Sequence, residues 1–165
     1  MKTYRKTSII VGILFIIGTV AGIFSGVVTE PVLGASDYLA QAAANESSMI
    51  LGAILVLVMG FPLAMIPVMM FPIFRKANET LALGAVVFRG VLEAMAYIVI
   101  AISWLLLISV GQAFVSADTA DAATLQAVGD FIKQALYWNE HILALVFTIG
   151  ALMLYWLFFK TKLIP

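Results

Sequence analysis

Four long apolar runs constrain the fold of this chain more than any other feature of its sequence. They cover residues 8–28, 49–74, 81–110 and 141–159. A hydrocarbon core about 30 Å thick is crossed by about 20 residues of helix. Because lipid offers no partners for backbone hydrogen bonds, each run must form a helix. We therefore predict an all-α transmembrane bundle of four spans, built as a single integral membrane domain over residues 1–165.

The composition excludes several classes of protein. Hydrophobic residues make up 64% of the chain and charged residues 11%, whereas soluble domains carry about 25% charged residues. Nine basic and nine acidic residues cancel, so we expect no nucleic-acid partner. The chain has no cysteine and one histidine, which argues against thiolate and multi-histidine metal sites. We expect no metal and no cofactor, and the lipid bilayer as the main partner.

The first run resembles a signal peptide because it follows Lys2, Arg5 and Lys6. Signal-peptide cores are only about 7–15 residues long, and this run is longer. No small-residue cleavage site follows it directly. We therefore predict a retained membrane anchor.

The charges between the runs separate by sign. Seven basic residues lie before the first run, between the second and third, or after the fourth, whereas the other two connections hold seven acidic residues with Lys133 as their only base. Loops rich in Lys and Arg stay in the cytoplasm. We therefore predict that both termini are cytoplasmic and that the two longer connections face outward.

The two outward connections are predicted to contain helices. Residues 37–47 are rich in alanine and are expected to extend the second span as helix. A second outer helix begins after Ser116 or Asp118, either of which is a suitable N-cap. Its apolar residues recur at helical spacing, at Leu125, Val128, Ile132 and Leu136. Such a helix lies on the membrane surface or covers the bundle.

Small residues recur every four positions along the first span, at Gly18, Gly22 and Gly26. This spacing lets another membrane helix approach closely. The partner is expected to be another span of the same chain, and the alternative is a second copy in a homo-oligomer.

Three prolines occur at intervals of five residues in the second span, at Pro62, Pro67 and Pro72. Each removes a backbone donor and crowds the preceding turn, so we expect the helix to be kinked or partly unwound there. One interpretation is a kinked packing helix. The other is a broken helix that lines a substrate or ion cavity, as in transporters.

The third span carries Arg89 and Glu93, which are four residues apart and so share one helix face. Tyr97 continues that face. With a membrane boundary near Gly90, Arg89 reaches the headgroups, whereas a boundary near Leu83 submerges both charges. We consider two roles. A structural clamp satisfies both charges within the protein. A functional site uses Glu93 to carry a proton or Arg89 to hold an anion.

Several short motifs resemble the prokaryotic integral membrane proteins of domain-of-unknown-function family 4386. They are residues 37–39 with 44–46, residues 81–84 with Phe88, Arg89 and Glu93, and residues 162–165. The resemblance implies a helical bundle in the cytoplasmic membrane, and the charged pair matches residues typical of the family. It implies no activity. Similar proteins continue into further spans, so we expect either a natural short form or a chain truncated at its C-terminus, with further membrane helices as partners.

No phosphate-binding glycine loop or zinc-protease motif is visible in the sequence. We therefore expect an integral membrane protein with a non-enzymatic role. The alternative is a small-solute or proton-coupled transporter that uses the proline-rich second span and Glu93. A membrane-embedded enzyme is a third class, which the shortage of catalytic groups disfavours.

Overall fold

The computed structural model describes the backbone of residues 2–163 and the side chains from Tyr4 onward. Met1, Ile164 and Pro165 lie outside the described residues, and so does the end of the 162–165 motif. The elements are α1 (Lys2–Leu33), α2 (Tyr38–Ala44), α3 (Glu46–Phe74), α4 (Glu79–Ala85), the π-helical segment η1 (Val86–Leu92), α5 (Glu93–Ser116) and α6 (Thr119–Thr161). Because α4, η1 and α5 follow one another without a break, residues 2–163 form five helices.

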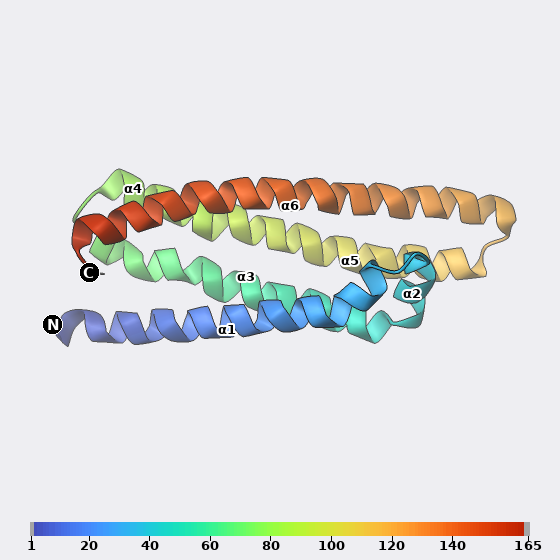
Figure 1. Cartoon of the computed structure of the whole chain (residues 1–165), viewed down its shortest axis with the longest axis horizontal. Coiled ribbons are helices and arrows are strands. Elements are labelled where there is room, and N and C mark those ends of the chain that lie inside the picture. The colour runs from blue at the N-terminus through green and yellow to red at the C-terminus, as the bar shows by residue number, and fades with distance from the viewer. Residues whose placement is uncertain (1, 164–165) are drawn as a thin grey trace.

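Four of these helices are long and apolar enough to cross a membrane, which confirms the predicted four-span, all-α fold. They cover Tyr4–Leu33, Glu46–Phe74, Glu79–Ser116 and Thr119–Thr161. Both termini and the turn between α3 and α4 lie at one end of the bundle (Figure 1), which we call the terminal end. We call the opposite end, where α2 lies, the α2 end.

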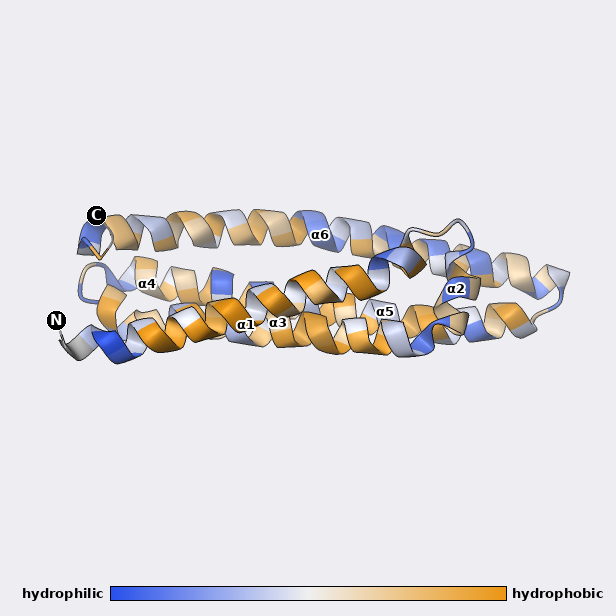
Figure 2. Ribbon diagram, turned by 60° about the horizontal axis from the view of Figure 1, so that its bottom comes forward, coloured by the Kyte–Doolittle hydropathy of each residue, from blue (hydrophilic) through white to orange (hydrophobic). Residues whose placement is uncertain are grey.

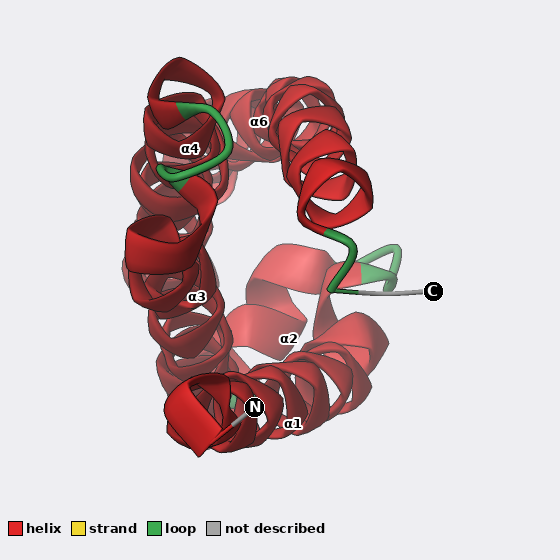
Figure 3. Cartoon of the chain, turned by 90° about the vertical axis from the view of Figure 1, so that its left-hand side faces the viewer, coloured by secondary structure: helices red, strands yellow, loops and turns green. Residues whose placement is uncertain are grey.

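The helices form an open arc rather than a closed ring. α1 packs on α3, α3 on α5, and α5 on α6. In the view along the bundle, α1 and α6 lie at the two ends of this arc, and α2 lies at the far end of the bundle (Figure 3). α2 packs on α5. At this contact the two backbones are close, since a Cβ on Gly111 of α5 would lie 3.2 Å from the backbone nitrogen of Ala43 in α2.

Apolar residues dominate most of α1, α3 and α5 (Figure 2), and many of them are exposed. On α1, for example, Ile16 and Ile23 are each 62% exposed and Phe24 is 57% exposed. Patches of this size on a soluble protein would cause aggregation. They are suited to contact with lipid, whose hydrocarbon tails are as apolar as these side chains.

The small residues of α1 contact another span of the same chain, as predicted, but only two of the three glycines do so. A Cβ at Gly18 would lie 2.7 Å from Cγ of Leu63, and one at Gly22 would lie 3.2 Å from Cγ of Met59. A Cβ at Gly26 would meet nothing within 4 Å. The prediction is therefore wrong for Gly26, because α3 packs on this turn of α1 through Ser25, whose hydroxyl donates to the Gly52 oxygen at 3.0 Å, and Gly26 is exposed on another side of the helix.

The three prolines do not unwind the second span. α3 is one α-helix from Glu46 to Phe74, with Pro62, Pro67 and Pro72 inside it. Of the two predicted outcomes, a kink or partial unwinding, the unwinding is wrong. Each proline removes only one backbone donor, and the five-residue spacing leaves intact backbone hydrogen bonds between the prolines. Pro67 is buried, Pro62 is half-buried and Pro72 is exposed.

The two outward connections also differ from the prediction. α2 does not extend α3, because the chain turns at Asn45, where the side-chain amide donates to the backbone oxygen of Gln41 at 3.0 Å. The second outer helix is not separate, since α6 runs as one helix of 43 residues that starts after the Asp118 cap. Leu136 is buried and Ile132 packs against the main apolar cluster, but Val128 is 42% exposed, so the predicted apolar face is covered only in part. This part of the chain continues the fourth span as one helix rather than forming a separate surface helix.

Candidate functional site

The charged pair lies where the third span changes its helical geometry. Residues 86–92, which include Arg89, form a π-helix within an otherwise α-helical span. The backbone N–H of Glu93 donates to the oxygen of Phe88, five residues earlier, as well as to Gly90. Such π-helical insertions are rare in proteins overall, and those that occur often lie at functional sites. The sequence predicts the charged pair but not this change of helical geometry.

Glu93 is buried, and both of its polar partners lie on its own span. The residue is 1% exposed. One carboxylate oxygen accepts a hydrogen bond from the Tyr97 hydroxyl at 3.0 Å, and the other forms an ion pair with Arg89 Nη1. Arg89, Glu93 and Tyr97 are thus one connected group on one helix face, as their spacing predicted. We call these three residues the charged network.

Neighbouring helices contact the charged network through an aromatic ring and two glycines. From α6, the Phe147 ring lies 4.2 Å from the Arg89 guanidinium carbon, and a Cβ at Gly150 would lie 2.5 Å from Arg89 Cγ. From α3, a Cβ at Gly60 would lie 2.8 Å from Tyr97 Cδ2. Because Gly60 and Gly150 have no side chains, α3 and α6 can pack closely against the charged network.

The helix pairing gives the position of the charged network relative to the tryptophans of α6. Gly150, opposite Arg89, is six residues from Trp156 and twelve from Trp138 on α6, or about 9 Å and about 18 Å along the helix axis. If these tryptophans mark the two interfaces, both charges are submerged. Arg89 also points toward Glu93, away from the nearer terminal end, so it does not extend to the headgroups.

Of the three prolines, Pro67 approaches the span that carries the charged network, at Gly90. Gly90 lies against the second span, where its Cβ would be 3.4 Å from the Ala64 backbone oxygen and 3.8 Å from Pro67 Cγ. Pro62 and Pro72 do not share the burial of Pro67. The structure therefore brings Arg89, Glu93, Tyr97 and Pro67 into one region but does not gather all three prolines around Glu93.

A cavity of about 430 Å³ lies beside the charged network, between α1, α3 and α6. Its polar lining includes Arg89, and most of its wall is apolar: Val11, Phe15, Ile66, Met70, Leu154 and Phe158. Glu93 is not part of this lining. The cavity therefore differs from the one that the transporter interpretation requires, which is polar and reaches Glu93.

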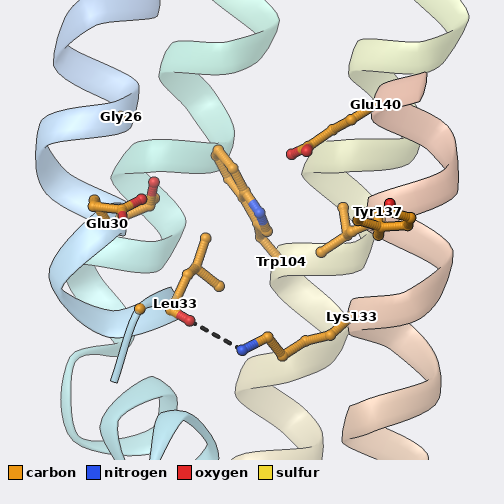
Figure 4. Close-up of a pocket in the computed structure, with 10 residues that line it drawn as sticks. Gly26, Glu30, Leu33, Trp104, Lys133, Tyr137 and Glu140 are labelled. Carbon is orange, nitrogen blue, oxygen red and sulfur yellow. Dashed lines mark hydrogen bonds between the residues drawn. The ribbon is translucent and has the colours of Figure 1, made fainter. Parts of the chain in front are cut away.

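A second cavity, of about 390 Å³, lies between α1 and α6 at the α2 end. Its polar lining comes from Glu30, Lys133 and Glu140, with the Trp104 ring between the helices (Figure 4). In the sequence, Lys133 is the one base among the acidic residues of the two outer connections. The sequence does not bring these residues together, because their proximity depends on how three helices pack.

Hydrogen bonds fix α2 against α6 near this second cavity. The Tyr38 hydroxyl donates to Asp130 Oδ1 at 2.7 Å, and Gln126 Nε2 donates to the Tyr38 oxygen at 3.2 Å. Burial raises the pKa of the Tyr38 phenol above its ordinary value, and the neighbouring Asp130 carboxylate raises the pKa further. Tyr38 therefore stays protonated and serves as a donor across the physiological pH range.

The fold and the buried charged network define a multi-pass helical membrane protein. The family model for DUF4386, a domain of unknown function, matches residues 10–165. The chain belongs to this family, as its short motifs predicted. No match was found among curated proteins, and none among solved structures.

Proposed function

We propose that this chain is a non-enzymatic, multi-pass protein of the cytoplasmic membrane whose charged network acts as a structural clamp. The main support is the environment of Glu93, whose two carboxylate oxygens are engaged by Arg89 and Tyr97. A carboxylate that is held on both sides and buried is poorly placed to exchange protons with a substrate. Paired charges inside a membrane bundle commonly satisfy each other in this way.

The clamp joins helices by packing rather than by an ion pair between them. The ion pair lies within one span, since Arg89 and Glu93 are four residues apart. The ion pair makes the polar face of this span nearly neutral, and the Phe147 ring and Gly150 of α6 pack on Arg89. The network thereby lets a charged face be buried between apolar helices.

The alternative is a small-solute or proton-coupled transporter. The observation that favours it is the cavity beside Arg89, whose wall includes Ile66 and Met70 from α3, where they lie between Pro62 and Pro72. In that mechanism Arg89 holds an anionic group, and Glu93 accepts a proton when the anion displaces it from the ion pair. The prolines give α3 weak points at which it bends.

Proton flux into proteoliposomes distinguishes these two functions. With an imposed pH gradient and an internal pH-sensitive dye, the clamp predicts that wild type and Glu93→Gln give the same slow acidification as empty liposomes. Size-exclusion chromatography in detergent confirms that the variant is folded. A flux in wild type that Glu93→Gln abolishes would refute the clamp and support transport.

We also propose that both termini face the cytoplasm. The bundle places both at one end (Figure 1), together with Arg75 and Lys76, and positive loops remain inside. Because the chain lacks cysteine, Ala77→Cys and Ala123→Cys provide single labels at exposed positions near opposite ends. A membrane-impermeant maleimide added to intact cells should label the second variant and not the first. Labelling at position 77 and not at position 123 would contradict the proposal and show that both termini face outward.

A further inference from the structure

We propose that the cavity between α1 and α6 at the α2 end binds an organic ammonium group. Its volume of about 390 Å³ is within the range of small-molecule sites. Its lining combines carboxylates, an aromatic ring and apolar side chains, which are the groups that recognise substituted ammonium ions. This inference is independent of the role of the charged network.

The charges that line the cavity favour a cation. Glu30 on α1 and Glu140 on α6 contribute carboxylates, and Lys133 is the one basic side chain in the lining. Lys133 is already engaged, since its Nζ donates to the backbone oxygen of Leu33 at 3.1 Å and lies 4.2 Å from the centre of the Tyr38 ring. Within residues 4–163 no side chain bonds to either carboxylate, so both are available to a ligand.

Trp104 supplies the aromatic surface. Its ring projects from α5 into the space between α1 and α6, and the Glu140 side chain extends toward it from α6 (Figure 4). Tryptophan is the aromatic residue that binds cations over its face most strongly. Leu33 and Leu136 add apolar lining, which suits the methyl or methylene groups of an organic ammonium better than a strongly hydrated metal ion.

The ammonium group has two sources, a zwitterionic lipid headgroup or a free solute. The cavity lies near the outer aromatic residues Tyr137 and Trp138 of α6, at the depth of the headgroups. It also lies between two helices that do not pack closely on each other. A headgroup can therefore enter from the side, and a solute from the α2 end.

Choline is a suitable probe for this site. The full chain in phosphatidylglycerol nanodiscs should bind choline saturably in isothermal titration, with a sodium chloride blank. We expect binding of 3,3-dimethylbutan-1-ol, the uncharged isostere of choline, to be at least about tenfold weaker, because it lacks the charge that the carboxylates and the ring attract. Absence of saturable choline binding, or equal binding of the isostere, would overturn the proposal.

Matched variants locate the binding. Glu30→Gln with Glu140→Gln keeps the shape of the cavity and should weaken choline binding at least about tenfold, and Trp104→Leu should weaken it without changing the charge. Glu79→Gln, at the exposed start of α4 near the terminal end, should leave it unchanged. Unchanged binding in the double variant would also overturn the proposal.

In nanodiscs that contain phosphatidylcholine, loss of choline binding identifies a lipid headgroup as ligand and retention identifies a free cation; both support an ammonium site.

Discussion

Replacing Glu93 by alanine is expected to lower the free energy of unfolding by about 3–5 kcal/mol, the usual cost of removing one partner of a buried ion pair. The variant leaves the Arg89 guanidinium beside the Phe147 ring without its anion. It also removes the acceptor of the Tyr97 hydroxyl. Reversible unfolding in mixed micelles of dodecyl sulfate and a mild detergent, followed by circular dichroism, measures this loss.

Tyr97→Phe is the matched control for this prediction. It removes one hydrogen bond to the same carboxylate but leaves the ion pair and the ring that packs on Gly60. Side-chain hydrogen bonds within membrane bundles contribute about 0.6 kcal/mol on average, so the loss should be several times smaller. Equal losses for Glu93→Ala and Tyr97→Phe would show that the ion pair adds nothing to the free energy of unfolding beyond the Tyr97 hydrogen bond.

Gly150→Leu is expected to have the second large effect, because Arg89 occupies the space where the side chain would go. Even a Cβ at this position would lie 2.5 Å from Arg89 Cγ and 3.0 Å from the Arg89 backbone nitrogen. The backbone atom belongs to the span itself, so α6 must move away as a unit. Overpacking of this kind typically costs about 1–3 kcal/mol, and displacing Arg89 from Glu93 adds to it.

Gly12→Leu is the control for the glycine variant. Gly12 lies in α1, and a Cβ there would meet nothing within 4 Å. The same unfolding measurement should therefore show little change for Gly12→Leu and a clear loss for Gly150→Leu. If Gly150→Leu were as stable as wild type, α6 would not pack on the charged network as described.

The fold was predictable from sequence because membrane spans depend on local properties. Length and hydropathy are enough to identify a helix that must satisfy its own hydrogen bonds in lipid. The ends were less predictable: α6 begins at Thr119 rather than near residue 141, because its polar half packs on α2 and α5. Hydropathy does not distinguish such a helix from one on the membrane surface.

The charged network was predictable in part. The four-residue spacing of Arg89, Glu93 and Tyr97 identified their shared face, and the structure shows them in contact. The π-helical segment and the contacts with Phe147 and Gly150 depend on the approach of α6, and no local pattern indicates them. For the same reason the spacing of Gly26 predicted a helix contact that the structure does not contain.

A double-mutant cycle tests whether Arg89 and Glu93 stabilise each other. Unfolding free energies are measured for wild type, Arg89→Ala, Glu93→Ala and the double variant. The clamp predicts that the double variant recovers part of the stability lost by each single variant, with a coupling free energy of about 2 kcal/mol or more. Losses that add to within about 0.5 kcal/mol would contradict the clamp and would mean that each charge acts on a different partner.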